Sequence, residues 1–345
     1  MGSMRFRRIF VFLSLSLLLA ACAAPEAVET VPADADSTAV PAVEPSPTPA
    51  PTTAPTAAPS PTPIPTPTPV PTPFSMIWIP DTQSVVYHYP HNLPAMGEWL
   101  DQEVSRGDIA CVLQTGDAVE NAFNPHYWEL FQPITDAFVG RVPFVEIAGN
   151  HELGMKLHDY SGFQNLDWIR AIPAERKFED GKGIYTLFNA GGTDFIVLGV
   201  GYDAELDAAD WMNETLSRYA DRPAILLFHA YIKADGELLP IGAELLDRVV
   251  SRSPNVRLVL CGHVRGRNGF RTDALDDDGD GEPDRTVYSL MCNYQDSGTD
   301  NGQMRKLTFD PVERSILVST YSPVTGRYYR DHTHRSYDFT IENAF

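Results

Sequence analysis

The sequence predicts an α/β fold in which two mixed β-sheets pack face to face and helices cover their outer faces. Between residues 76 and 260, short apolar runs alternate with amphipathic stretches, a pattern that favours strands and helices in alternation within a layered fold. After Thr286, several apolar runs follow one another without a helical stretch, which is typical of antiparallel strands. We therefore expect a four-layer αββα sandwich.

Each expected element rests on its own residue pattern. The first six apolar runs are expected to be buried strands: 76–79, 109–113, 142–147, 195–200, 224–228 and 256–260. Three later runs are expected to be antiparallel strands: 287–291, 306–309 and 315–321. Helices are expected along Met96, Leu100 and Val104, after the capping pair Asn124-Pro125, and over 208–219.

Residues 1–21 have the pattern of a signal peptide. Three arginines, Arg5, Arg7 and Arg8, precede an apolar run over 9–19, which is too short for the roughly 20 residues that a membrane-spanning helix needs. The run ends in Leu19-Ala20-Ala21-Cys22, which resembles the lipobox of bacterial lipoproteins. That resemblance implies that Cys22 becomes a lipidated N-terminus, and it predicts a protein anchored outside the cytoplasm. A simple transmembrane anchor is the alternative.

Residues 22–73 are expected to form a disordered stalk, because 16 of the 29 prolines of the chain fall between Pro25 and Pro73. Such a segment has too few apolar side chains to offset the entropy of ordering, and its prolines favour an extended polyproline II conformation. At ~3.1 Å per residue, the Pro-Thr repeat over 45–73 would reach on the order of 90 Å. Residues 74–345 are then left to form a single large domain.

The charge and the cysteines restrict the class of protein further. A formal net charge of −20 argues against a nucleic-acid groove, although it leaves room for a small phosphorylated substrate if a bound metal dominates the local field. Apart from Cys22, only Cys111, Cys261 and Cys292 remain. We expect buried free thiols, with a disulfide as the chemically allowed alternative outside the cytoplasm.

Polar residues follow the buried strands at their C-terminal ends, which is where open α/β sheets collect their sites. These clusters are, in chain order, Asp81-Thr82-Gln83, Gly116-Asp117, Gly149-Asn150-His151-Glu152, His229 and Gly262-His263-Val264-Arg265. Carboxylate oxygens, an amide oxygen and imidazole nitrogens together suit Mn, Fe or Zn. A single Asp or Asn after a strand is usually a turn or capping residue, but the ordered set predicts a metal centre.

The ordered set resembles the calcineurin-like metallophosphoesterase family, whose motifs run D-x-H, G-D, G-N-H-[DE], H and G-H-x-H. The resemblance implies hydrolysis of a phosphomonoester, phosphodiester or pyrophosphate by hydroxide bound to one or two divalent metals. In this reading Asp117 bridges two ions, the second of which is held by Asn150, His229 and His263. Asp81 belongs to the first-metal site, and His151 protonates the leaving group.

Two positions depart from the family pattern. Gln83 and Arg265 stand where the pattern has histidines, and both belong to the first-metal site. The site is then either a weak, oxygen-rich position for Mn, Mg or Ca, or a position where Arg265 replaces the ion as a phosphate clamp. The third outcome is a surface-tethered binding protein without turnover. We expect a working enzyme, because His151 and the second-metal ligands are retained.

Other segments offer further candidates. Residues 87–91, Tyr-His-Tyr-Pro-His, are expected to be a loop, either lining the substrate entrance or simply exposed. Glu120 and Asn121 resemble substrate-side positions of the family, with a capping role as the alternative. Residues 293–295 follow a late strand and either pack near the site or take no part in it; we expect the second.

An acidic stretch over 276–284 predicts a structural calcium loop. Its candidate ligands are Asp276, Asp278, Asp280, Glu282 and Asp284. Their spacing partly follows a calcium-loop pattern, with Gly281 at the sharp turn, but position twelve is Val287 instead of the usual glutamate. The stretch therefore looks more like the short Asp-rich loops of extracellular calcium-binding repeats. The alternative is a solvated acidic turn between strands.

Overall fold

A computed structural model describes residues 71–153, 158–329 and 338–345. The expected signal peptide, Cys22 and nearly all of the expected stalk therefore lie outside the described residues. In the described part, no helix has both the length and the apolar character that a membrane crossing requires.

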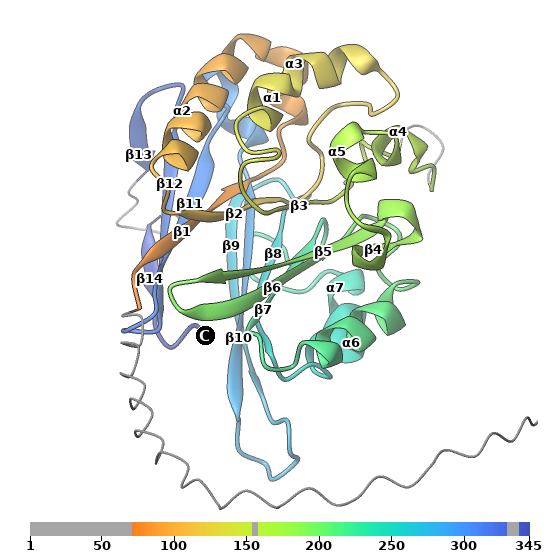
Figure 1. The fold of residues 1–345 in the computed structure, drawn as a ribbon, viewed down its shortest axis with the longest axis vertical. Helices are drawn as coiled ribbons and strands as arrows, with labels where there is room; N and C mark the ends of the chain where they lie inside the picture. The colour runs from red at the N-terminus through yellow and green to blue at the C-terminus, as the bar shows by residue number, and fades with distance from the viewer. Residues whose placement is uncertain (1–70, 154–157, 330–337) are drawn as a thin grey trace, which may run out of the picture. The chain divides into compact units, whose positions relative to one another are not determined.

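The first sheet combines parallel strands near the N-terminus with antiparallel strands near the C-terminus (Figure 1). Its strand order is β13-β12-β11-β1-β2-β3, with β14 also paired to β12. The parallel strands are β1 (Phe74–Ile79), β2 (Ile109–Gln114) and β3 (Phe144–Glu146). The antiparallel strands are β11 (Met304–Asp310), β12 (Ser315–Ser322), β13 (Arg327–Tyr329) and β14 (Phe339–Ile341).

The second sheet has the order β4-β5-β6-β7-β8-β10-β9. Its strands are β4 (Lys177–Phe178), β5 (Gly183–Ala190), β6 (Thr193–Val200), β7 (Ala224–Phe228), β8 (Val256–Cys261), β9 (Arg267–Leu275) and β10 (Arg285–Asn293). The pairs β6–β7, β7–β8 and β8–β10 are parallel, whereas the edge pairs are antiparallel. Because β7 and β8 run in the same direction, their carboxyl ends meet at one edge of this sheet.

The two sheets enclose a shared apolar core. Side chains from β1 and β11 meet side chains from β6, and the rings of Phe74 and Phe309 stack with centroids 4.8 Å apart while Phe195 packs edge-on against Phe74. The three thiols Cys111, Cys261 and Cys292 are buried and free, as expected. Burial of apolar area at roughly 25 cal/mol per Å² makes this interior the main source of stability.

Helices cover the outer face of each sheet and complete the four layers. The first sheet is covered by α1 (Gln83–His88), α2 (Leu93–Ser105) and α3 (Pro125–Thr135). The second is covered by α6 (Ala209–Arg218) and α7 (Pro240–Leu245). Asn124 caps α3 as expected, because its side chain accepts a hydrogen bond from the amide of His126. The short helices are α4 (Ser161–Gln164), α5 (Asp167–Arg170), η1 (Pro90–Asn92), η2 (Ala174–Arg176), η3 (Glu179–Gly181), η4 (Leu246–Val250) and η5 (Gln295–Asp300).

The predicted αββα sandwich is confirmed, but three local predictions are wrong. Residues 87–91 are not a loop, because they span the end of α1 and most of η1. A short helix, η5, lies between β10 and β11, where we expected strands only. The strand β10 also pairs in parallel with β8 and in antiparallel with β9, so it is not purely antiparallel. The strands β4, β5, β9, β13 and β14 were not anticipated. In β9 several polar residues interrupt the apolar pattern.

Candidate metal centre

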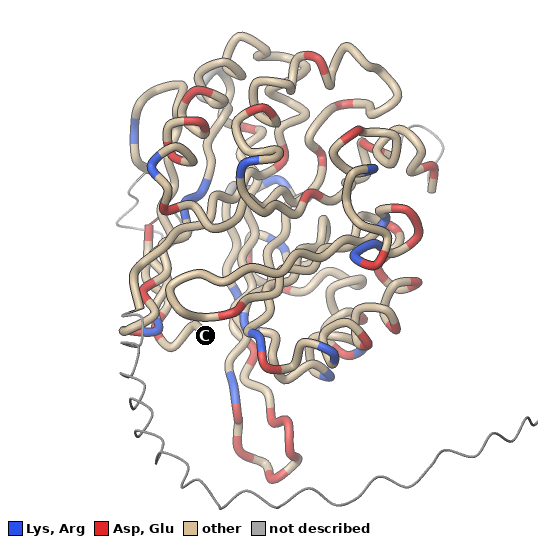
Figure 2. Tube along the Cα trace, in the orientation of Figure 1, with Lys and Arg blue, Asp and Glu red and all other residues tan. Residues whose placement is uncertain are grey.

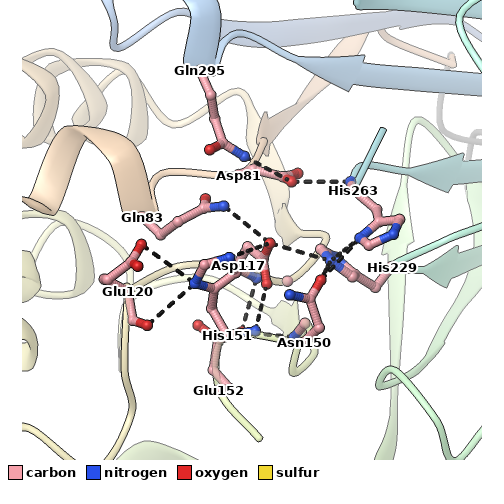
Figure 3. A network of polar contacts seen from close by, with 12 residues as sticks. Asp81, Gln83, Asp117, Glu120, Asn150, His151, Glu152, His229, His263 and Gln295 are labelled. Carbon is pink, nitrogen blue, oxygen red and sulfur yellow. Dashed lines mark hydrogen bonds and ion pairs between the residues drawn. The ribbon is translucent and has the colours of Figure 1, made fainter. Parts of the chain in front are cut away.

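The predicted site residues converge where the carboxyl ends of strands from both sheets meet (Figure 3). Asp81, Asp117 and Asn150 follow β1, β2 and β3 of the first sheet, while His229 and His263 follow β7 and β8 of the second. The carboxyl ends of parallel strands lie at the same edge of a sheet, so the strand topology brings the side chains that follow them together. Neither sheet carries the whole set.

One group of ligand atoms surrounds a common centre. The Oδ1 of Asn150 lies 3.1 Å from Nε2 of His229 and 2.9 Å from Nδ1 of His263. The two imidazole nitrogens are 3.2 Å apart, and Asp117 Oδ2 lies 3.4 Å from Nε2 of His229. Ligand atoms of Asp117, His229 and His263 all fall within 4.8 Å of one another. Carboxylate, amide and imidazole donors in this arrangement fit a divalent transition metal.

The ionisation of the two histidines also fits a cation. Burial alone would lower the pKa of His229, but the charge of Asp117, reinforced by Asp81, raises it to about 10. Burial and the charge of His229 lower the pKa of His263 to about 4. The negative charge of Asp117 thus favours a positive charge within this buried cluster. A bound metal ion would supply that charge in place of a proton, since metal ligands must be deprotonated.

The backbone around the centre is strained and tightly packed. Asp117 has φ 53° and His263 has φ 62°, the left-handed region that side chains other than glycine rarely adopt. A Cβ on Gly149 would lie 2.2 Å from Oδ1 of Asp117, so only glycine allows this close approach. Glu152, which is fully buried, accepts hydrogen bonds from the amides of Asp117, Val119 and Gly149 and ties the loops after β2 and β3 together.

Asp81 and Gln83 lie beside this group, with Gln83 at the first turn of α1 (Figure 3). The Nε2 of Gln83 donates a hydrogen bond of 3.0 Å to Oδ2 of Asp117. Asp81 accepts hydrogen bonds from the side chains of Asn293 and Gln295 at 2.8 and 3.3 Å. Our expectation that residues 293–295 lie outside the site is therefore wrong. In the sequence, the only indication of a role in the site was that Asn293 and Gln295 are polar and follow a late strand.

His151 lies at the side of the ligand group. Its Nδ1 is 3.3 Å from a carboxylate oxygen of Glu120, and its Nε2 is 4.0 Å from Oδ2 of Asp117. The imidazole is 31% exposed, so it can reach a substrate while Glu120 orients it. Asn121 instead accepts a hydrogen bond from the amide of Phe123, which stabilises the turn before α3, whereas the helix itself is capped by Asn124.

Arg265 lies on the rim of the site. Its Nη1 donates a hydrogen bond of 2.9 Å to Oδ1 of Asp296, and the two side chains are 64% and 52% exposed. Tyr87, from the segment expected to be a loop, packs edge-on against Tyr127 of α3 and is 53% exposed.

The sequence profile described as "Calcineurin-like phosphoesterase" matches residues 76–265, which is more than half of the chain. The chain belongs to the calcineurin-like phosphoesterase family. The activity that this family implies is metal-dependent hydrolysis of a phosphoester. The matched region begins in β1 and ends just beyond β8, so it contains all of the strand ends that carry Asp81, Asp117, Asn150, His229 and His263.

Two individual proteins resemble this calcineurin-like phosphoesterase. The uncharacterized protein YvnB of Bacillus subtilis (strain 168) is 34% identical over 259 residues, which cover 72% of this chain and 20% of YvnB. This chain therefore spans about a fifth of the length of that relative. The purple acid phosphatase PPD1 from yellow lupin (Lupinus luteus) seeds matches with a TM-score of 0.54 at 15% identity, covering 79% of this chain and 54% of that one. The likeness to the purple acid phosphatase PPD1 shows a shared fold and nothing more.

The acidic stretch over 276–284 forms the turn between β9 and β10, and Figure 2 shows its acidic residues gathered at the tip of this hairpin. Carboxylate oxygens of Asp276, Asp278 and Asp284 all lie within 4.8 Å of one another. Asp280 and Glu282 do not join that group. The carboxylates of Asp276, Asp278, Asp280 and Asp284 all accept hydrogen bonds from backbone amides of the turn. The turn brings together only part of the expected ligand set.

Proposed function

We propose that the protein is a metal-dependent hydrolase of phosphate esters, acting on a phosphomonoester, phosphodiester or pyrophosphate. The observation that carries the proposal is the meeting of Asp117, Asn150, His229 and His263 around one centre, with polar atoms 2.9 to 3.4 Å apart. These four residues would hold one divalent ion, Mn, Fe or Zn, and Asp81, Gln83 and Asp117 would hold a second. When bound, the metal would activate a water molecule and polarise a phosphoryl oxygen.

The protein's own side chains have separate tasks in this proposal. His151, oriented by Glu120, would protonate the leaving oxygen of the ester, because one of its nitrogens is paired with a carboxylate and the other faces the centre. Arg265 on the rim would hold a phosphoryl oxygen through its guanidinium fork. Glu152 would keep the loops after β2 and β3 in register through its three accepted hydrogen bonds.

The substrate that we propose is a small phosphorylated molecule. A net charge of −20 repels a polyanion such as a nucleic acid, whereas a single phosphate group needs only the local field of the metal and Arg265. The proposed location is outside the cytoplasm, with a lipid on Cys22 and the Pro-Thr stalk holding the domain away from the membrane. That location is supported by the sequence over residues 1–73 alone.

The deciding experiment is an assay of the purified protein on an aryl phosphomonoester and an aryl phosphodiester, with bound metal measured in the same samples. We expect turnover that disappears on chelation and returns with Mn, Fe or Zn. Tight binding of metal without turnover on either ester would favour the alternative, a surface-tethered binding protein on this fold.

A structural calcium ion on the β9–β10 turn is a separate proposal. It is supported by the carboxylates of Asp276, Asp278 and Asp284, which are exposed and close together, since Ca²⁺ prefers several carboxylate oxygens. This ion would stabilise the hairpin and take no part in hydrolysis.

A further inference from the structure

Asp81 and Gln83 differ from the other site residues in the hydrogen bonding of their side-chain oxygens. Oδ2 of Asp81 accepts hydrogen bonds from the backbone amide of His263 and from the side chains of Asn293 and Gln295. Its other oxygen, Oδ1, is buried and accepts none. Oε1 of Gln83 is likewise buried without a hydrogen-bond partner. A carboxylate oxygen and an amide oxygen that are both buried and unpaired carry a desolvation cost that a bound cation would remove.

The packing around Asp81 holds its carboxylate in one orientation. A Cβ on Gly262 would lie 2.0 Å from Oδ1 of Asp81, so the unpaired oxygen sits in a space that only glycine leaves open. Asn293 and Gln295 are 1% and 7% exposed, and both direct amide hydrogens at the opposite oxygen. Three donors on Oδ2 fix the carboxylate plane and leave Oδ1 as the oxygen available to a ligand.

The donor types on the two sides of Asp117 differ. On one side stand the imidazoles of His229 and His263, grouped with Asp117. On the other side the available atoms are oxygens, from Asp81 and Gln83, and among the described residues Asp81 joins no group of histidine or cysteine ligands. Oxygen ligands suit hard cations such as Mg²⁺, Mn²⁺ and Ca²⁺, whereas imidazole favours Zn²⁺ and Fe.

Arg265 does not fill the oxygen-lined position. Its guanidinium is paired with Asp296 and both side chains are more than half exposed, whereas Asp81 and Gln83 are 2% and 3% exposed. The guanidinium, paired with Asp296 near the surface, makes no hydrogen bond to Oδ1 of Asp81 or Oε1 of Gln83. The unpaired oxygens are therefore left for a cation.

We infer that the two cation positions are unequal: Asp81, Gln83 and Asp117 form an oxygen-only position for a hard divalent cation, beside an imidazole-containing position for a transition metal. Asn293 and Gln295 are positioning residues that aim Asp81 at the hard cation. This inference rests on the proposed function, since it assigns the metals of that same centre. It also decides between the two possibilities raised by Gln83 and Arg265 in the sequence, an oxygen-rich cation position and an arginine in place of the ion.

The test measures metal content of the full chain after chelation, zinc loading and desalting, followed by Mn²⁺ titration with electron paramagnetic resonance of free Mn²⁺. With the cluster on the β9–β10 turn removed by Asp278→Asn in all samples, we expect about one retained zinc ion and about one additional Mn²⁺ site per chain. Replacing Gln83 by histidine (Q83H) should roughly double the retained zinc and abolish the Mn²⁺ site. The matched control Q102H, on the exposed face of α2, adds a histidine elsewhere and should behave as the unsubstituted protein.

Two variants keep the inference testable if Q83H does not fold. Asp81→Asn should lose the Mn²⁺ site and retain one zinc. Gln295→Leu should weaken Mn²⁺ binding by roughly 10- to 100-fold without changing zinc content, and Gln295→Asn should restore part of the loss. Two equally retained zinc ions in the unsubstituted protein, or Mn²⁺ binding that survives Asp81→Asn, would overturn the inference.

Failure of the inference and failure of the proposed function give different results in these samples. One zinc and one Mn²⁺ per chain without turnover of an aryl phosphate would reject the hydrolase and leave the unequal positions intact. Turnover by a protein that retains two zinc ions would reject the unequal positions and leave the proposed hydrolase intact.

Discussion

The Oδ1 atom of Asn150 lies 2.9 Å from Nδ1 of His263, although Asn150 follows a strand of the first sheet and His263 follows a strand of the second. The centre therefore exists only when the two sheets are packed against each other. The buried residues between the sheets, and not the loops alone, determine the distances between the ligands. Local substitutions at the loops and at this interior should consequently both affect metal binding.

Replacing His151 by asparagine should lower kcat by roughly 10²- to 10⁴-fold, because the substitution removes a proton donor that lies outside the ligand group. Metal content measured by mass spectrometry should stay unchanged. Glu120→Gln, which removes only the partner that orients the imidazole, should have a smaller effect. A parallel loss of metal and activity in His151→Asn would show that His151 is a ligand instead of a general acid.

Replacing Arg265 by alanine should raise KM by about 10-fold while metal content stays the same, since the guanidinium lies on the exposed rim and would contact a phosphoryl oxygen. Lysine at this position should recover part of the lost substrate affinity, because it keeps the positive charge but lacks the two-pronged guanidinium.

Arg265→His should raise the retained zinc if a missing imidazole limits the oxygen-only position. Unchanged zinc in that variant would reject this explanation.

Gly149→Ala should reduce retained metal and lower the free energy of unfolding by about 1–3 kcal/mol, the usual cost of overpacking. The added Cβ would lie 2.2 Å from Oδ1 and 2.4 Å from the amide nitrogen of Asp117, so the aspartate would have to move. Gly192→Ala is the control, because its φ is 82° but its Cβ would meet nothing within 4 Å. The control should lose about 1 kcal/mol of stability and keep its metal. Equal metal loss in both variants would contradict the prediction.

Stability should fall as pH rises because of Glu146. Burial, opposed by the hydrogen bond from Trp168 and reinforced by the charge of Glu152, raises the pKa of Glu146 from 4.5 to about 8. The folded protein therefore binds this proton more tightly than the unfolded chain, and the associated stability is complete below pH 4.5 and lost as pH rises to about 8.

Glu146→Gln should remove this dependence. Relative to the unsubstituted protein, its free energy of unfolding should be similar near pH 4.5 and higher by on the order of a few kcal/mol above pH 8. Urea unfolding at several pH values measures the difference. Glu313→Gln, in the exposed turn between β11 and β12, is the control and should leave the curve unchanged. Parallel curves for Glu146→Gln would contradict the assignment.

Millimolar Ca²⁺ should raise the melting temperature by a few degrees, on the order of what about 1 kcal/mol of stabilisation gives, whereas equal Mg²⁺ should not. Asp278→Asn should abolish the shift, because it removes one of the three clustered carboxylates. Asp280→Asn, outside that cluster, is the matched control. The same shift in both variants, or none in the unsubstituted protein, would show that the turn is only a solvated acidic loop.

Sequence by itself determined the αββα architecture, the buried strands and the ordered polar residues that follow them. Apolar runs report burial directly, and Asp117, Asn150, His229 and His263 carry their chemistry in their residue types. The helix after Asn124 was likewise readable, because its cap is a contact between residues that are near in sequence. By contrast, residues 87–91 were wrongly assigned to a loop, since Pro90 interrupts the pattern although it starts η1 without strain.

Only the tertiary structure decided which polar atoms lie together. Asn293 and Gln295 reach Asp81 across more than 200 residues, and no periodicity links such distant positions. The place of Arg265 on the rim and the unpaired oxygens of Asp81 and Gln83 also depend on how β10 and η5 lie beside β8. Residue type determines what a side chain can bind, whereas chain packing determines which neighbours remain to be satisfied.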